Sequence, residues 1–232
     1  MHITTIDPTN ITDFSRDTNQ LEAFWLFCMF VAGKNSDYAS RCLSKLINSV
    51  NQLTHVPDGD GKFVLVALGN SEEEGIFNYF KSIGETGIHN ALVANKVGQY
   101  TRLTKGVMQS LDLDLTNCTL EDLLKIHGVG NKTARFFLLH TRKGCEYAVL
   151  DTHILAWLRS HGVEEAPKTT PTDNRLYRLI ENRFRHMSRA SYPHLTDAEI
   201  DLLIWSIQSG RLSDEEGFDM THPFESRDGV DD

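Results

Sequence analysis

Lys132 and Asp151 are the two residues of this sequence whose types and spacing indicate chemistry. Lys132 lies just after a Gly128-Val129-Gly130 turn, where the dipole of the following helix disfavours a cation and so favours the neutral amine. A neutral lysine can attack a sugar carbon and form a Schiff base. Asp151 follows 19 positions later, and a carboxylate there could accept the lysine's proton or stabilise positive charge on a ribose ring. The pair therefore indicates chemistry on a nucleic acid.

Each of these features also has a structural interpretation. Lys132 alone would be a solvated lysine near a helix start, and Asp151 alone would be an ordinary helix N-cap. A lone Gly-Val-Gly turn is more often a plain connection between helices. The ordered combination of turn, lysine, buried aliphatic approach (148–150) and Asp-Thr-His favours the catalytic interpretation.

The residues around the turn, 123–134, fit a helix-hairpin-helix. Its glycines allow a tight turn and let backbone amides approach a phosphate, while the second helix points its positive N-terminus at that phosphate. Such contacts position DNA without reading its sequence. We therefore expect Gly128, Val129, Gly130 and Thr133 to contact DNA.

Helical signals dominate the rest of the chain, so we predict an all-α fold. A short apolar run at 62–69 fits a strand or a helical turn, and its helical surroundings favour a short helix. The turn cluster at 57–61 contains part of a calcium-loop pattern but lacks the later ligands, which favours a plain loop. Helices are expected at residues 20–32, 36–50, 71–83, 88–111, 120–126, 131–141, 151–162, 174–190 and 196–209, and the stretch 88–111 is either continuous or broken near Gly98 or Gly106.

Charge is distributed unevenly along the chain. The net charge of −9 argues at first against a nucleic-acid partner, but residues 214–232 hold eight acidic residues and one arginine. The remaining chain is nearly neutral and can carry a local basic face. The longest apolar run, 23–32, is too short to cross a bilayer, and no signal peptide is recognisable. The scattered cysteines indicate a reducing compartment, so we expect an intracellular, DNA-associated protein with no membrane contact.

The stretch 119–153 resembles the helix-hairpin-helix DNA glycosylases whose Gly/Pro-rich loop ends in a catalytic aspartate, the HhH-GPD superfamily. The resemblance implies that Lys132 is the nucleophile of a bifunctional glycosylase and AP lyase, that Asp151 is the essential aspartate, and that His153 lies near DNA. It implies no cofactor for catalysis. It does imply a structural potassium or sodium ion, held by the backbone carbonyls of Leu124, Ile126 and Val129.

Two departures narrow the resemblance. Members similar to endonuclease III carry four closely spaced cysteines after the aspartate, whereas here no cysteine follows Cys145, so no iron–sulfur cluster is expected. The loop at 143–147 is also depleted, with one glycine and no proline. The chain resembles the smaller archaeal and bacterial 8-oxoguanine glycosylases in three features. These are the absence of the cysteine cluster, the spacing between the lysine and the aspartate, and the sequence of the segment 201–210.

Enzymes of this kind flip the damaged nucleotide out of the duplex. The turn at 33–36 takes the position of the inserted wedge, so Lys34 or Asn35 is the wedge candidate; a helix cap by Asn35 or Ser36 is the alternative. The base-pocket candidates are Trp205 and Phe136 for stacking, which also fit core positions, and Arg135 and Gln208 for hydrogen bonds.

The basic helix at 174–190 has two interpretations. Its arginines could face DNA phosphates, or they could form a solvated face paired with Glu181 or with the acidic tail. The arginines concerned are Arg175, Arg178, Arg185 and Arg189.

Together these patterns predict a two-lobed glycosylase with DNA in the cleft between the lobes. One lobe would be residues 25–143, the other would combine 1–24 with 144–213, and 214–232 would form an acidic, mobile tail. The predicted activity is removal of an oxidised base, 8-oxoguanine first, from double-stranded DNA by a monomeric glycosylase and AP lyase. The alternatives are the same fold acting on an oxidised pyrimidine or a mismatched base, and a non-catalytic DNA-binding module.

Overall fold

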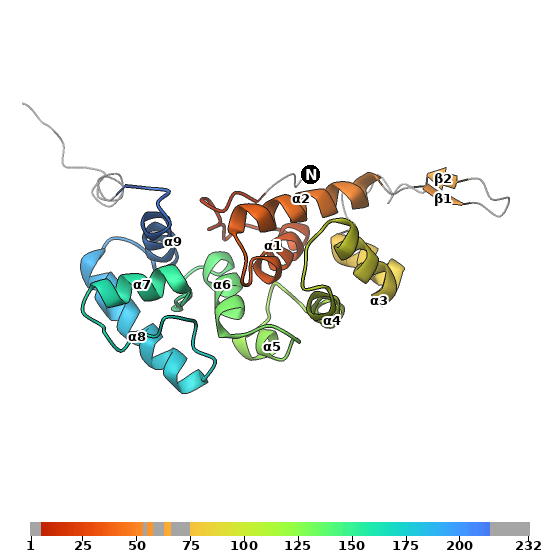
Figure 1. Ribbon diagram of the computed structural model, residues 1–232. Coiled ribbons are helices and arrows are strands. Elements are labelled where there is room, and N and C mark those ends of the chain that lie inside the picture. The colour runs from red at the N-terminus through yellow and green to blue at the C-terminus, as the bar shows by residue number, and fades with distance from the viewer. Residues whose placement is uncertain (1–5, 53–54, 58–62, 66–74, 214–232) are drawn as a thin grey trace, which may run out of the picture. The chain divides into compact units, whose positions relative to one another are not determined.

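The computed structural model describes residues 6–52, 55–57, 63–65 and 75–213 (Figure 1). The regular elements among these residues are helices apart from one pair of short strands, which confirms the predicted all-α class. The calcium-like cluster at 58–61, the acidic run at 72–74 and the tail at 214–232 lie outside the described residues. The elements are α1 (Thr18–Phe30), α2 (Ser36–Gln52), β1 (His55–Pro57), β2 (Phe63–Leu65), α3 (Ile76–Ala94), α4 (Tyr100–Ser110), α5 (Leu120–Leu124), α6 (Asn131–Thr141), α7 (Thr152–Ser160), α8 (Asn174–Ser191) and α9 (Asp197–Gln208).

The chain folds as two compact units, Met1–Lys143 and Gly144–Asp232. This division differs from the predicted one, because residues 1–24 belong to the first unit. The N–H of Asp13 donates to the carbonyl oxygen of His140 over 3.1 Å. The guanidinium of Arg16 donates to the same carbonyl oxygen over 2.9 Å. These contacts tie the N-terminal segment to α6, so its placement in the other lobe was wrong.

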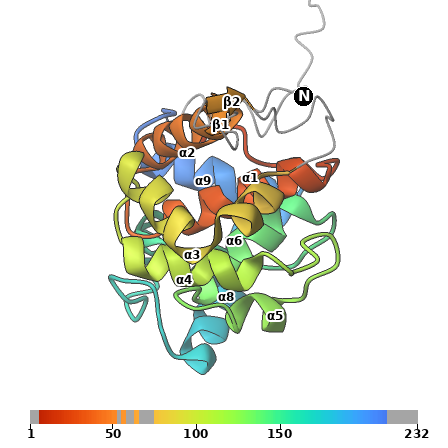
Figure 2. The ribbon, with the colours of Figure 1, turned by 90° about the vertical axis from the view of Figure 1, so that its right-hand side faces the viewer.

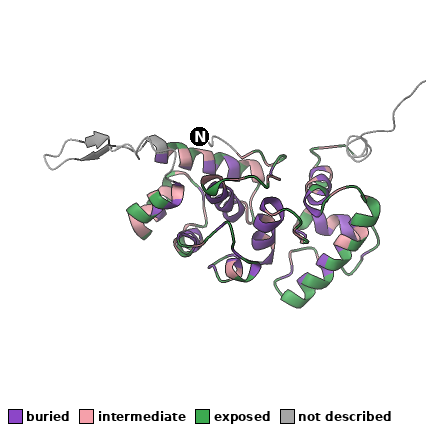
Figure 3. Cartoon of the chain, turned by 180° about the vertical axis from the view of Figure 1, so that it is seen from behind, coloured by how far each residue is buried: buried purple, intermediate pink, exposed green. Residues whose placement is uncertain are grey.

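Helix α1 forms the centre of the first unit. Its residues from Leu21 to Phe30 are all buried, and α2, α3, α4 and α6 contact it (Figures 2 and 3). Trp25 packs edge-on against Phe137 of α6, with ring centroids 5.2 Å apart, and its indole N–H donates to Ser110 Oγ of α4 over 2.9 Å. A helix that is apolar all round is stable only when neighbouring elements surround it.

Helix α3 is capped by a side chain from α1. Its own N-cap, Gly75, has no side chain to cap with, and Glu22 Oε2 accepts the N–H of Phe77 over 3.0 Å instead. A Cβ at Gly75 would lie only 2.2 Å from Glu22 Oε2, so a side chain there would displace the carboxylate that caps α3. Further along, Gly84 has a φ of +63° and kinks the helix.

Strands β1 and β2 pair antiparallel, with His55 opposite Leu65 and Pro57 opposite Phe63. The predicted short helix at 62–69 is therefore wrong at residues 63–65. Short apolar runs cannot be assigned to helix or strand by periodicity alone, and the glycine-containing cluster between the two runs is a hairpin signal.

The second unit has its own core between α7, α8 and α9. Trp157 of α7 packs edge-on against Phe184 of α8, with centroids 5.5 Å apart, and Ile200 and Ile204 of α9 belong to the same cluster. In the described part of the chain, no helix has the length and apolar character needed to cross a membrane.

Candidate active site

The glycine turn joins two helices as predicted. Gly128 has a φ of +75°, in the left-handed region that favours glycine, and the N–H of Val129 donates to the carbonyl oxygen of Ile126 over 3.1 Å. Gly130 is the extended N-cap of α6, which begins at Asn131. The segment is a helix-hairpin-helix, and the first N–H groups of α6, which have no partner within the helix, follow directly on the turn.

The first helix of the hairpin begins with a reciprocal cap. Asp122 accepts the N–H of Thr119 over 3.1 Å, and Thr119 Oγ1 accepts the N–H of Asp122 over 3.2 Å. The Lys125 ammonium donates to Asp122 Oδ1 over 2.9 Å. The hydrogen bonds from Thr119, then that from Lys125, lower the pKa of Asp122 from 3.8 to about 2.

Arg102 of α4 braces the hairpin. Its NH1 donates to the carbonyl oxygen of Gly128 over 2.9 Å, its NH2 to that of Met29 over 3.1 Å, and its Nε to Gln99 Oε1 over 2.6 Å. Burial lowers the pKa of Arg102. The sequence alone did not identify this residue, because an arginine on an amphipathic helix carries no signal of the distant carbonyls that it binds.

Lys132 is the second residue of α6 and is half-buried. Within the described residues its ammonium forms no hydrogen bond or ion pair. A close neighbour is the fully buried Cys28 of α1, whose thiol pKa is raised well above its usual value by burial, against the opposing charges of Arg16 and Lys132. A neutral thiol is no counter-ion, so the lysine is not held in a structural ion pair.

Two pocket candidates on α6 have structural contacts within the first unit. Arg135 is only 2% exposed, and its NH1 donates to Asn131 Oδ1 over 2.7 Å. Phe136 packs against Phe24, with centroids 5.8 Å apart, and edge-on against His140 at 5.2 Å. These contacts fit the core interpretation of Phe136, and Arg135 is buried and bonded to the first residue of its own helix. Thr133 is buried too, which leaves its backbone N–H as the group for a phosphate.

The aliphatic approach to Asp151 is held by buried polar side chains of the second unit. Tyr177 of α8 accepts the N–H of Leu150 over 3.0 Å and donates to the carbonyl oxygen of Ala148 over 2.9 Å. Glu181 accepts the N–H of Ala148 over 3.0 Å. These bonds satisfy backbone groups that would otherwise be buried without partners.

Asp151 is the N-cap of α7. Its Oδ1 accepts the N–H groups of His153 over 2.9 Å and Ile154 over 2.8 Å. Within the described residues Oδ2 accepts no hydrogen bond. The cap interpretation is therefore correct, and it orients the carboxylate while leaving one oxygen available for chemistry.

Two further predicted residues of the second unit, His153 and Trp205, contact each other. The ring of His153 meets Trp205 of α9 edge-on, with centroids 6.3 Å apart, and the guanidinium of Arg211 lies 5.0 Å from the Trp205 ring centroid. Trp205 is half-buried, whereas Gln208 is exposed. Sequence reasoning missed Arg211, which lies beyond the end of α9.

The wedge candidates lie in the α1–α2 turn. Asn35 Oδ1 accepts the N–H of Tyr38 over 3.1 Å, so Asn35 caps α2. The Lys34 ammonium donates to the carbonyl oxygen of Val97. To insert between bases as a wedge, either side chain would have to break the hydrogen bond that it forms here.

Two α8 arginines that were candidates for DNA binding form ion pairs. Arg185 and Arg189 both bind Asp197, with Nε–O distances of 2.8 and 2.6 Å, and both bind Glu146 over 3.2 Å. The partners of these two arginines are Asp197 and Glu146, which neither interpretation named. Arg175 and Arg178 are exposed.

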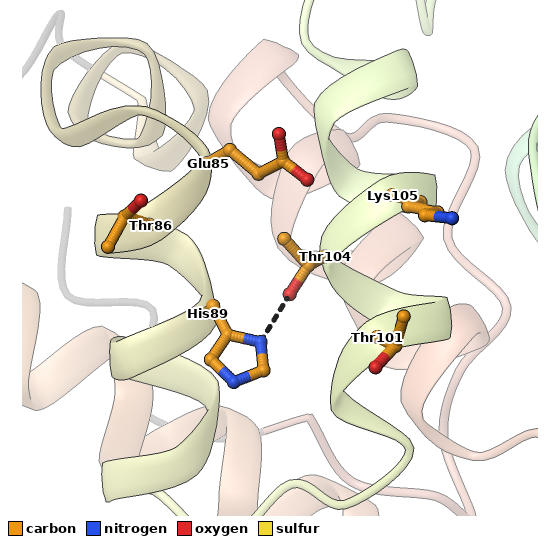
Figure 4. A pocket seen from close by; sticks show the side chains of 6 residues that line it. All are labelled: Glu85, Thr86, His89, Thr101, Thr104 and Lys105. Carbon is orange, nitrogen blue, oxygen red and sulfur yellow. Dashed lines mark hydrogen bonds between the residues drawn. The ribbon is translucent and has the colours of Figure 1, made fainter.

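A pocket of about 260 Å³ lies between α3 and α4 (Figure 4). His89 and Thr104 line it, with His89 Nδ1 3.4 Å from Thr104 Oγ1. No predicted site residue lines this pocket, so it is not part of the candidate active site.

The comparisons with known proteins bear on the fold. No protein-family model matches the sequence. A solved structure of the Methanocaldococcus jannaschii 8-oxoguanine glycosylase/lyase, in complex with 15mer DNA containing 8-oxoguanine, is similar with a TM-score of 0.60 and 19% sequence identity. The match covers 84% of this chain and 84% of that chain. The chain therefore has the helix-hairpin-helix fold of that glycosylase/lyase, as the resemblance predicted.

Proposed function

We propose that the protein is a base-excision-repair DNA glycosylase with AP lyase activity. The observation that carries the proposal is the setting of Lys132, which follows the glycine hairpin directly, is half-buried and forms no ion pair within the described residues. A structural lysine would be expected to have a carboxylate partner or to be fully solvated. The similar fold of a DNA-bound glycosylase/lyase supports the same activity.

The proposed reaction begins with a flipped nucleotide. Lys132 Nζ attacks C1′ as the glycosidic bond breaks, and the base leaves with the bonding electron pair and takes up a proton. Asp151 stabilises positive charge on the sugar and accepts a proton released in the reaction. The sugar ring opens to a Schiff base on Lys132. Loss of a C2′ proton then expels the 3′ phosphate by β-elimination.

The hairpin would bind the DNA backbone. The N–H groups at the start of α6 are suited to one phosphate. The carbonyl of Ile126 accepts one hydrogen bond, and in the described part of the chain those of Leu124 and Val129 accept none from the backbone. Three carbonyls of one turn fit a monovalent cation, which would add positive charge beside that phosphate.

We propose 8-oxoguanine in duplex DNA as the substrate and a monomer as the active form. The test is a panel of duplexes carrying 8-oxoguanine, an oxidised pyrimidine, a mismatch, an abasic site or no lesion, with released base and cleaved strand both quantified. Release of 8-oxoguanine with strand cleavage is expected. Release of another base instead would show that 8-oxoguanine is not the substrate. Tight binding with no release from any duplex would indicate a non-catalytic binding module.

A further inference from the structure

Three separate turns of the first unit bring glycines close to the same polar side chains. Gly33, Gly98 and Gly128 have φ values of +72°, +74° and +75°. A Cβ at Gly98 would lie 3.6 Å from Lys34 Nζ, and a Cβ at Gly128 would lie 2.5 Å from Arg102 Cγ. The glycines at Gly98 and Gly128 therefore leave room for the backbone of these turns to lie close to the two cations.

Gln99 ties the turns together. Its Oε1 accepts the Nε–H of Arg102 over 2.6 Å, and its Nε2 donates to the carbonyl oxygen of Ala32 over 3.3 Å. A Cβ at Gly33 would lie 3.7 Å from the same Nε2. The α1–α2 turn, the α3–α4 turn and the hairpin thus meet at this side chain and its arginine partner.

Neither cation has a carboxylate partner in the described part of the chain. Lys34 donates to the carbonyl oxygen of Val97, and Arg102 donates to two carbonyls and to Gln99, all of them neutral acceptors. Burial, and then the charge of Arg102, lowers the pKa of Lys34. Lysine has three N–H donors and arginine five, so each side chain keeps two beyond these bonds.

We propose that Lys34 and Arg102 bind a backbone phosphate of DNA, at a site separate from the amides of the hairpin. The proposal rests on the proposed function. Two neighbouring cations in a partly desolvated site repel each other, and an anion between them relieves the repulsion. A phosphate suits the fork of an arginine and the point charge of a lysine, and glycine turns allow its close approach. Lys34 would then contact the DNA backbone and would not act as a wedge between bases.

The salt dependence of DNA binding tests this site. Dissociation constants for an undamaged duplex are measured over a range of salt concentrations with the full chain, Lys34→Gln, Lys34→Arg and Lys45→Gln. Lys45 is an exposed lysine of α2 in the same unit and serves as the control. Each lost phosphate contact reduces the slope of log K against log salt by about 0.9.

We expect that reduction for Lys34→Gln alone, with wild-type slopes for Lys34→Arg and Lys45→Gln. An unchanged slope for Lys34→Gln would overturn this site and leave the proposed function standing. A wild-type chain that bound no duplex at all would overturn both.

Discussion

The carbonyl oxygen of Gly128 lies 2.9 Å from NH1 of Arg102, and the missing side chain of this glycine is what allows the approach. The hairpin is thus shaped by a residue of α4 as well as by its own sequence. Because α6 starts directly after the turn, the same contact helps to position the start of α6, where Lys132 is the second residue.

Gly128→Ala should destabilise the protein more than Gly144→Ala. Both glycines have a φ of +75°, so each substitution carries the same backbone strain, roughly 1–2 kcal/mol. Only at Gly128 would the new Cβ meet Arg102, which adds about 1–3 kcal/mol of overpacking. Urea unfolding of the two variants measures the difference. Equal losses would mean that the side chain of Arg102 moves aside freely.

Asp151 combines a structural and a proposed catalytic role, and two substitutions separate them. Asp151→Asn keeps an oxygen that accepts from His153 and Ile154, so its free energy of unfolding should stay within about 1 kcal/mol of wild type. Asp151→Ala removes the cap and should cost about 1 kcal/mol. Base release should fall by a factor of at least about 100 in both variants. Wild-type base release by Asp151→Asn would leave the residue with its capping role alone.

The capping box of the hairpin should respond to acid. The folded-state pKa of Asp122 is about 2, below its ordinary value of 3.8, because Thr119 and Lys125 donate to the carboxylate. Its contribution is therefore fully present above pH 3.8 and is lost as the pH falls through about 2. The difference in unfolding free energy between wild type and Asp122→Asn should be constant above pH 5 and should shrink between about pH 4 and 2. A difference independent of pH would show that the charge is not what stabilises the cap.

Local signals in the sequence were sufficient to predict the helices and the hairpin. The apolar run of α1, the Thr119 cap and the Gly-Val-Gly turn each act over a few neighbouring residues, and the structure has all of them in place. The strand β2 was missed because three apolar residues have no distinctive period.

Long-range partners could not be read from the sequence. Nothing in the type or position of Arg102 indicates that it binds carbonyls 26 and 73 positions away. Likewise, Arg185 and Arg189 pair with Asp197 and Glu146, a choice that depends on how α8 packs within its unit. When a side chain could pair with several residues, the tertiary fold decides which of them it meets. The local spacing of residues in the sequence does not contain that information.

Borohydride trapping on a duplex containing 8-oxoguanine tests the central claim most directly, because it reduces a lysine Schiff base to a stable cross-link. Wild type and Lys143→Gln, an exposed lysine of the same unit, should cross-link to the DNA. Lys132→Gln should form no cross-link, should bind the duplex within about tenfold of wild type, and should unfold at nearly the same urea concentration, since the ammonium has no structural partner among the described residues. Cross-linking by Lys132→Gln at the wild-type level would contradict the assignment of Lys132 as the nucleophile.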